Sequence, residues 1–263
     1  MRILITGANG YIGKSLFNAL RDEHYVTAIT RKEVELTDSV AVTEFFKTSH
    51  FFDVVIHCAV LGGSRLQKDD WSVMDKNLIM YYNLFANRSR FGRFIHFGSG
   101  AETYMPKEPY GYSKKVIAKS ILNKDDFYNI KIFGVFDENE LDTRFIKANL
   151  IRYIEKQPMQ IYKDKAMDFF YMEDLVRVVK YYMEAQEPPK EFDCTYGSIP
   201  STLKVIASRI NDLDEHKVEV LFAEEGGLDW YISKYRETTL PIELIGLEEG
   251  IKRTYNKLKN ETN

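Results

Sequence analysis

The chain has few cysteines and no long apolar run, and each shortage excludes a class of protein. Cys58 and Cys194 are its only two cysteines in 263 residues, too few for a disulfide framework and typical of a reducing compartment. No uninterrupted apolar stretch approaches the roughly 18 residues of a membrane span, and the N-terminal residues carry no apolar signal core. The sequence therefore predicts a cytoplasmic protein without a membrane span.

Neither sign of charge dominates. Lys and Arg number 36 and Asp and Glu 39, which gives a net charge of −3. This balance argues against a general nucleic-acid binder, which needs a basic surface. It leaves room for a local basic pocket that holds one phosphorylated small molecule. No metal-ligating residues are assigned.

Short apolar runs alternate with helical periodicity in the N-terminal half. Strands are expected at Arg2–Thr6, His24–Thr30, Phe52–Cys58, Arg93–Phe97 and Asn129–Val135, and helices at Tyr11–Arg21, Ser39–Thr48, Trp71–Ser89 and from about Tyr110. Strands that alternate with helices imply crossover units and a parallel sheet. The sequence therefore predicts an α/β fold with a doubly wound parallel sheet.

The second half of the chain is less regular. Helices are expected at Phe145–Lys156, Met172–Ala185, Leu203–Asn211 and Gly246–Lys259, and strands at Met159–Tyr162, Phe192–Tyr196 and Lys217–Phe222. We expect a nucleotide-binding core over residues 1–135. Residues 136–263 are expected to form mainly a smaller α/β substrate cap, with some segments returning to the core.

Glycine recurs at every third position directly after the first expected strand, at Gly7, Gly10 and Gly13. Glycine permits a positive φ angle and lets the backbone approach a pyrophosphate closely. The helix that opens here presents N–H groups and a positive dipole end to an anion. The alternative is a plain strand-to-helix turn. The pattern favours nucleotide binding by the glycines together with Tyr11 and Ile12.

This Gly-x-x-Gly-x-x-Gly spacing, so close to the N-terminus, resembles the extended short-chain dehydrogenase/reductase family of epimerases and dehydratases. The resemblance covers nearly the whole chain and is closest in pattern to the GDP-fucose synthase-like keto-reductases. It implies a Rossmann-type fold, an NAD(P)-dependent enzyme, a nucleotide-sugar substrate and a homodimer. The dimer seam would involve Trp71–Ser89 and Tyr110–Leu122, with an apolar surface supplied by Leu78, Tyr81, Tyr82 and Phe85.

The second expected strand ends in Thr30, Arg31 and Lys32. A carboxylate at this place would accept hydrogen bonds from the ribose 2′-hydroxyl of NAD. Two cations suit a 2′-phosphate instead, and Arg31 can grip it with two hydrogen bonds. A solvated basic turn is the alternative. We predict NADP as the cofactor, with NAD possible.

Further cofactor contacts follow from the resemblance. Glu35 and Leu36 match a pair that flanks the adenine. Cys58, Ala59 and Val60 resemble the family's turn beside the cofactor ribose. The side chains of His57 and Cys58 are expected to pack in the strand. Phe133 and Val135 belong to a segment that resembles the strand ending beside the nicotinamide.

Tyr110 and Lys114 lie four positions apart, which puts both side chains on one face of a helix. A nearby ammonium favours the phenolate form of tyrosine, so Tyr110 could transfer a proton near neutral pH. Family members carry Ser or Thr after the preceding strand, and Ser99 stands there. Ser99 would hydrogen-bond the reacting oxygen, and Lys114 could also reach the nicotinamide ribose. The alternatives are an ordinary helix pair and a turn hydroxyl.

Two features qualify this assignment. The same Tyr-x-x-x-Lys spacing recurs at Tyr255 and Lys259, where we expect only an amphipathic C-terminal helix. Ser99 and Tyr110 lie only 11 positions apart, whereas most relatives have a much longer connection. A short connection predicts a more open active site.

The substrate residues are assigned on the resemblance alone. Gly62 follows the ribose turn. Met167 replaces an arginine that often meets substrate phosphate, so Arg144, Arg152 or Lys165 could substitute, although each could equally be a surface charge. Asp168 and Asp174 are expected to be structural.

The first functional interpretation is an NADP-dependent reductase that acts on the keto group of a nucleotide-activated deoxysugar. Ala101 and Arg144 stand where GDP-fucose synthase carries its epimerisation Cys and His, so 3,5-epimerisation is not expected. A nucleotide-sugar 4-epimerase with retained cofactor and a catalytically silent NADP sensor are the alternatives. A dehydratase is disfavoured, because Gly100 and Ala101 replace its usual Asp-Glu pair, although Glu102 lies nearby.

Overall fold

The computed structural model describes residues 1–64, 67–197, 200–224, 226, 228–236 and 238–262. The chain forms two compact units. The first contains Met1–Lys131 and Val179–Phe192, and the second contains Ile132–Val178 and Asp193–Asn263. The chain thus leaves the first unit after Lys131, returns to it for Val179–Phe192 and then leaves it again.

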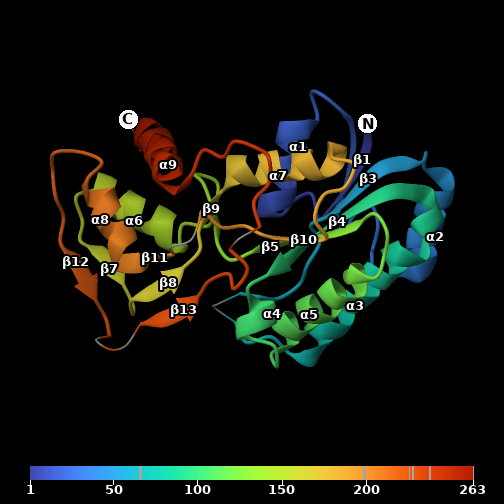
Figure 1. The fold of residues 1–263 in the computed structure, drawn as a ribbon, viewed down its shortest axis with the longest axis horizontal. Helices are drawn as coiled ribbons and strands as arrows, with labels where there is room; N and C mark the ends of the chain where they lie inside the picture. The colour runs from blue at the N-terminus through green and yellow to red at the C-terminus, as the bar shows by residue number, and fades with distance from the viewer. Residues whose placement is uncertain (65–66, 198–199, 225, 227, 237, 263) are drawn as a thin grey trace. The chain divides into compact units, whose positions relative to one another are not determined.

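The first unit is built on a six-stranded sheet with the order β10-β5-β4-β3-β1-β2 (Figure 1). Pairs β1–β2, β1–β3 and β3–β4 are parallel. The fold prediction is therefore confirmed: this is a Rossmann-type α/β sheet. The strands are β1 Arg2–Thr6, β2 Tyr25–Ile29, β3 Phe52–His57, β4 Phe91–Ser99, β5 Phe127–Ile132 and β10 Glu191–Asp193.

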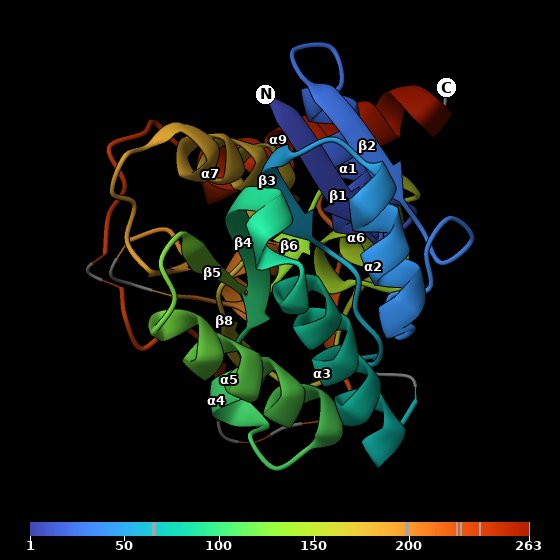
Figure 2. The same cartoon turned by 90° about the vertical axis from the view of Figure 1, so that its right-hand side faces the viewer.

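Helices cover both faces of this sheet. Figures 1 and 2 show α3 and α5 side by side on one face, and Figure 1 shows α1 on the opposite face. Asp38 caps α2 by accepting the N–H groups of Val40 and Ala41, and Pro109 suits the first turn of α5 because it lacks an N–H. The helices are α1 Tyr11–Leu20, α2 Ser39–Thr48, α3 Trp71–Ala86, α4 Ala101–Tyr104 and α5 Pro109–Leu122, with a 3₁₀ turn at Arg88–Arg90.

An aromatic core fills the space between the sheet and the helices α2, α3 and α5. Phe94 and Phe127 stack with ring centroids 4.8 Å apart, and Tyr81 packs edge-on against Phe94. Tyr81 is fully buried, so its assignment to a dimer seam is wrong. Leu78 and Phe85 also pack against this core, whereas Tyr82 is 45% exposed.

In its described part, the second unit combines short strands with helices around its own core. Its helices are α6 Phe145–Ile154, α8 Leu203–Asn211 and α9 Leu247–Thr262, and α7 Met172–Glu184 begins in it and ends in the first unit. Strand β6 (Val135–Phe136) pairs with β9 (Phe170–Tyr171), and β7 (Met159–Ile161) pairs with β12 (Val220–Phe222). The third sheet has the order β11-β8-β13 and consists of Ser201–Thr202, Lys165–Met167 and Asp229–Tyr231.

Within the described ranges, no helix is both long and apolar enough to cross a bilayer. Over the same residues, no group of three or more His, Cys, Asp or Glu side chains gathers as a metal ion would require.

Candidate functional site

The glycine loop lies where the order of the sheet reverses. The chain goes from β1 to its neighbour β2 and then crosses to β3 on the other side of β1. In open α/β sheets, ligands bind outside the carboxyl ends of the strands at such a point. Thr6 and His57 are partners at these ends, and Thr6 Oγ1 lies 2.8 Å from His57 Nδ1.

Two positions of this loop accept only glycine. Gly7 has a φ of +65°, and a Cβ atom on it would lie 2.6 Å from the backbone of Ala59. A Cβ atom on Gly13 would lie 2.4 Å from the carbonyl oxygen of Gly7. Gly10 then caps α1, whose first turn carries no acidic residue. The close backbone and the open helix end make a cradle that fits a dinucleotide pyrophosphate.

Hydrogen bonds join this loop to the strand ends beside it. Ala8 N–H donates to Ile29 O at 3.1 Å, and Cys58 N–H donates to Thr6 O at 3.2 Å. Burial lowers the pKa of His57 to about 3 and raises the pKa of the Cys58 thiol. Both side chains are therefore uncharged. His57 is the last residue of β3, whereas Cys58 follows the strand and is half-buried, like Ala59. Val60 is 42% exposed.

Two carboxylates, those of Glu33 and Glu35, lie in the turn after β2 together with the cations that are predicted to bind the 2′-phosphate. Glu33 Oε2 accepts the N–H of Thr30 at 2.7 Å and its hydroxyl at 2.6 Å, and these bonds lower the pKa of Glu33. Arg31 Nε lies 3.3 Å from Glu35 Oε2. Leu36 is buried in the core. Each cation in this turn thus has a carboxylate near it, and Glu33 is a residue that the predicted site did not include.

Ser99, Tyr110 and Lys114 come from two neighbouring elements. Ser99 is the last residue of β4, and the other two lie on α5. Lys114 Nζ donates to Phe97 O at 2.6 Å and lies 5.9 Å from the centroid of the Tyr110 ring. Burial lowers the pKa of Lys114 to about 8. The predicted ammonium is thus beside the end of the strand that carries the predicted serine.

The loop after β3 packs against Tyr110. Gly62 and Gly63 have φ angles of +77° and +73°, and a Cβ atom on Gly63 would lie 2.9 Å from Tyr110 Cζ. The buried Asn77 holds this loop through both Leu61 N–H, at 2.9 Å, and Leu61 O, at 3.0 Å. Asn77 lies on α3, and no motif around its amide marks this role in the sequence.

Asn77 also connects this loop to α5. Its Nδ2 lies 3.2 Å from Ser113 Oγ, and Ser113 Oγ donates to Tyr110 O at 2.7 Å. Asn77 and Ser113 thus fix the loop and the first turn of α5 together.

The short connection between Ser99 and Tyr110 is ordered. It forms α4 and a turn, and a Cβ atom on Gly111 would lie only 2.1 Å from Met105 O, so α4 packs directly on α5. Ala101 N–H donates to Ser99 Oγ at 3.2 Å. Glu102 is buried, and its Oε1 accepts the N–H of Ser99 at 2.9 Å.

The other predicted residues lie in the second unit. Arg144 is exposed before α6, Arg152 lies in the last turn of α6, and Lys165 is half-buried on β8. Phe133 is buried against the ring of Tyr231, and Val135 begins β6.

A buried polar cluster in the second unit surrounds Asp168. This carboxylate accepts Ser233 N–H at 2.7 Å, accepts the Thr195 hydroxyl at 3.0 Å and pairs with Arg236. The buried Asp174 likewise holds a main-chain group, because it accepts the N–H of Ile245 at 2.7 Å. Arg236 is absent from the predicted residues because it lies far from Asp168 in the chain.

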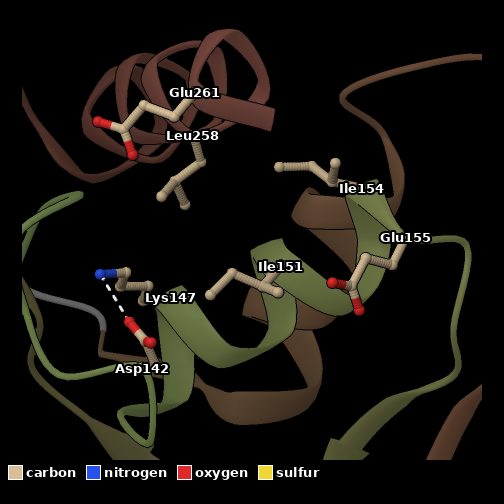
Figure 3. Close-up of a pocket in the computed structure, with 7 residues that line it drawn as sticks. All are labelled: Asp142, Lys147, Ile151, Ile154, Glu155, Leu258 and Glu261. Atoms are coloured by element: carbon tan, nitrogen blue, oxygen red, sulfur yellow. Dashed lines mark ion pairs between the residues drawn. The ribbon is translucent and has the colours of Figure 1, made fainter. Parts of the chain in front are cut away.

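A pocket of about 320 Å³ opens between α6 and α9 (Figure 3). Lys147 and Asp142 form an ion pair of 2.8 Å on one side of it, and Ile151 and Leu258 supply apolar surface. The described residues that line this pocket include none of those assigned to cofactor or substrate.

A family model for NAD-dependent epimerases and dehydratases matches residues 3–194. The chain belongs to this family. The predicted resemblance is thereby confirmed, and with it the prediction of a dinucleotide-dependent enzyme. Among curated relatives, CDP-abequose synthase from Yersinia pseudotuberculosis is 22% identical to this chain over 250 residues. The match covers 84% of this chain and 87% of the relative.

Two solved structures share the fold of this chain over nearly its whole length. A GDP-L-fucose synthetase from Naegleria fowleri bound to NADP has a TM-score of 0.78 at 16% identity, covering 99% of this chain and 94% of that one. A UDP-glucuronic acid 4-epimerase from Bacillus cereus in complex with NAD has a TM-score of 0.74 at 18% identity, covering 99% of this chain and 99% of that one. At these identities the likeness extends to the fold alone.

Proposed function

We propose that this family member is an NADP-dependent reductase of the keto group in a nucleotide-activated deoxysugar. The observation that carries the proposal is the placement of Tyr110 and Lys114 beside the end of β4, where Ser99 stands. The glycine cradle at the neighbouring strand ends fits the dinucleotide. The similarity to CDP-abequose synthase supports a nucleotide-sugar substrate.

Each residue of this group has a separate task. The bound dinucleotide would supply hydride chemistry to the sugar carbonyl carbon. Tyr110 would deliver a proton to the carbonyl oxygen, because a positioned phenol can act as a general acid. Ser99 would donate a hydrogen bond to the same oxygen as negative charge develops on it. Lys114, protonated at neutral pH, would hold the ribose hydroxyls of the dinucleotide and stabilise the charge that forms on Tyr110.

Glu102 separates this proposal from a dehydratase. A dehydratase needs a carboxyl group that faces the substrate, and Glu102 is the acidic residue nearest to Ser99 in the chain. Its Oε1 accepts the N–H of Ser99, and its Oε2 lies 3.4 Å from Lys131 Nζ. Both oxygens are thus engaged inside the first unit, which supports reduction over elimination of water.

NADP is the proposed cofactor because Arg31 and Lys32 follow β2 without a carboxylate at position 30. The exposed Arg31 can leave Glu35 for a phosphate, since a surface ion pair of this kind contributes only about 0–1 kcal/mol. Arg144, Arg152 and Lys165 remain proposed contacts of the substrate diphosphate, and Gly62 a contact of the sugar.

A 4-epimerase is the second candidate, because it would use the same Ser99, Tyr110 and Lys114 to oxidise and re-reduce one carbon of the sugar. The deciding experiment mixes the protein and NADPH with 4-keto deoxysugars linked to CDP, GDP, dTDP or UDP. A reductase consumes one NADPH for each sugar reduced. A parallel reaction holds NAD⁺ or NADP⁺ with the 4-hydroxyl sugar nucleotides, because an epimerase first removes hydride from C4. Inversion at C4 with no net reduction of the dinucleotide would identify an epimerase. Tight NADPH binding with neither reaction would contradict both and favour a silent sensor.

A further inference from the structure

Glu102 and Lys131 form an ion pair inside the first unit, directly behind the turn that carries Ser99. Lys131 Nζ lies 3.4 Å from Glu102 Oε2, and the side chains of Lys131 and Glu102 are only 8% and 7% exposed. Burying two charges costs more free energy than an apolar pair of the same size, so such a pair is not explained by stability. Its contacts with the residues around it supply another reason.

The carboxylate of Glu102 fixes the main chain at Ser99. Its Oε1 accepts the Ser99 N–H at 2.9 Å, while the N–H of Ala101 holds the Ser99 hydroxyl oxygen at 3.2 Å. A Cβ atom on Gly98 would lie 2.4 Å from Glu102 Oε1 and 2.6 Å from Asn129 Oδ1. The carboxylate therefore lies against the end of β4, in a space that only glycine leaves open.

The same carboxylate lies close to Lys114, whose Nζ donates to Phe97 O at 2.6 Å, one residue before the Gly98 against which Glu102 Oε1 packs. Its charge therefore acts on that ammonium. Burial lowers the pKa of Lys114 to about 8, and the Glu102 carboxylate opposes that shift. Lys131 and Lys114 in turn favour the ionised form of Glu102 against the burial that raises its pKa. The other titratable groups that face Lys114 are His57, Cys58, His96 and Tyr110. Burial keeps both histidines and the Cys58 thiol uncharged near neutral pH, so among these groups Glu102 is the anion that favours a protonated Lys114.

We propose that Glu102, supported by Lys131, is a positioning residue of the reaction, holding the Ser99 turn and keeping Lys114 charged. This inference rests on the proposed function. Glu102 transfers no proton to the substrate, because its two oxygens are used by Ser99 and Lys131. It acts through the two groups that do meet the sugar and the cofactor.

The test begins with Glu102→Gln, which keeps an oxygen for the Ser99 N–H and removes the charge. We expect kcat for the keto sugar to fall about 10- to 100-fold with KM changed less than about threefold. NADPH affinity, measured by fluorescence titration, should decline at high pH as Lys114 deprotonates. In Glu102→Gln that decline should move about one pH unit lower.

Glu191→Gln is the matched control, because Glu191 accepts from Asn129 at 3.1 Å in the same region without touching Ser99. It should match the parent.

Lys131→Met provides an independent variant. It leaves Glu102 buried without its cation, so the carboxyl takes up a proton and the same shift of the NADPH profile should appear. The double variant Glu102→Gln/Lys131→Met carries neither charge. It should therefore fold, with a melting temperature near that of the parent, even if a single variant does not, and it should keep the shifted profile.

Two results would overturn the inference. A parent-like kcat and NADPH profile in Glu102→Gln would show that the charge has no role. A lower kcat with an unshifted profile would show a structural defect only. Failure of the proposed function is a separate outcome: if the parent reduces no sugar nucleotide, the NADPH binding profiles still decide whether Glu102 controls Lys114.

Discussion

Two Tyr-x-x-x-Lys pairs in this chain differ in their surroundings rather than in their spacing. Lys114 is buried and donates to Phe97 O beside Ser99. Tyr255 donates its hydroxyl to Asp214, which also pairs with Lys259 at 2.9 Å. Burial and the Asp214 carboxylate raise the pKa of Tyr255, which makes it a poorer proton donor. Tyr255 is therefore a matched internal control for Tyr110.

Tyr110→Phe should keep the ring that packs against Gly63 but remove the acid. We expect turnover of the keto sugar to fall about 10²–10⁴-fold, the usual contribution of a positioned general acid. NADPH affinity should stay close to that of the parent. Tyr255→Phe, assayed after thermal melts show both variants folded, should retain turnover. Parent-like activity in Tyr110→Phe would remove this residue from the mechanism.

Two substitutions in the turn after β2 should change NADPH affinity in opposite directions, and together they test the choice of cofactor. Arg31→Ala should weaken NADPH binding by about 1–3 kcal/mol, as for a lost charged hydrogen bond. Glu33→Gln should strengthen it, because the ionised carboxylate held by Thr30 lies in the same turn and repels a 2′-phosphate. Dissociation constants for NADPH and NADH measure both effects. Equal changes for the two cofactors would contradict recognition of the 2′-phosphate at this turn.

At the scale of elements, the connection from β4 to α5 is compact because α4 packs directly on α5. The contact passes over Gly111, where the backbone of Met105 occupies the space of a side chain. Tyr110 precedes Gly111, so this contact also sets the first turn of the helix that carries the predicted acid. The connection is thus short and ordered, rather than an open loop.

Gly111→Ala tests this packing, because the substitution should lower the free energy of unfolding here, whereas at most helical positions it raises it. In a helix interior, alanine is usually more favourable than glycine by about 1 kcal/mol. Here the methyl group would lie 2.1 Å from Met105 O, so we expect a loss of about 1–3 kcal/mol from overpacking. Urea unfolding measures the change. Lys115→Ala on the same helix should lie within about 0.5 kcal/mol of the parent.

The sequence predicts the first unit better than the second, for a physical reason. Strands β1 and β3 are mainly apolar segments of five and six residues between clear turns, and the glycine spacing marks the loop after β1. Strands β11 and β13 have only two and three residues, too short to show alternation. Pairs such as Glu102 with Lys131 form between distant positions without any motif. Contacts of this kind, and Asn77 with Leu61, become visible only once the fold brings the elements together.

At the scale of the whole molecule, the predicted dimer remains a prediction, with a revised surface. Trp71 and Tyr112 are 56% and 42% exposed, and their rings meet edge to face at 6.3 Å across α3 and α5. Ile79 and Tyr82 are also exposed on α3, at 42% and 45%. They lie three positions apart and so share a helix face.

The double variant Ile79→Glu/Tyr82→Glu should place unsolvated charge in a seam between two copies and so favour the monomer. Light scattering at micromolar concentration, with NADPH present, should give twice the mass for the parent and a single mass for the variant. Tyr25→Glu is the control, since Tyr25 is 80% exposed on β2, away from these helices. A parent that is monomeric would contradict the dimer.

Global stability should depend on pH through His96, which is 1% exposed. Among the described residues, neither of its ring nitrogens has a hydrogen-bond partner, and burial lowers its pKa well below the usual range. The unfolded chain therefore binds the extra proton first as pH falls below about 6.5, so this histidine lowers stability progressively toward acid pH.

Replacing that imidazole by a ring that cannot be protonated removes the acid penalty. His96→Phe should become more stable than the parent below about pH 6.5, by up to about 1.4 kcal/mol for each further pH unit. Urea unfolding at several pH values measures the difference. His50→Phe, at an exposed position, should show no such trend. A pH-independent difference for His96→Phe would refute the assignment.

The return of Val179–Phe192 to the first unit determines how this chain can be made and divided. Strand β10 lies at the edge of the sheet beside β5, and Asn129 N–H donates to Lys190 O at 2.9 Å. During synthesis on the ribosome, β5 thus emerges well before the strand that covers it. Until then it is an open edge on which other chains can add. A fragment that ends after β5 would keep the glycine loop and Tyr110 and yet carry that aggregation-prone edge permanently.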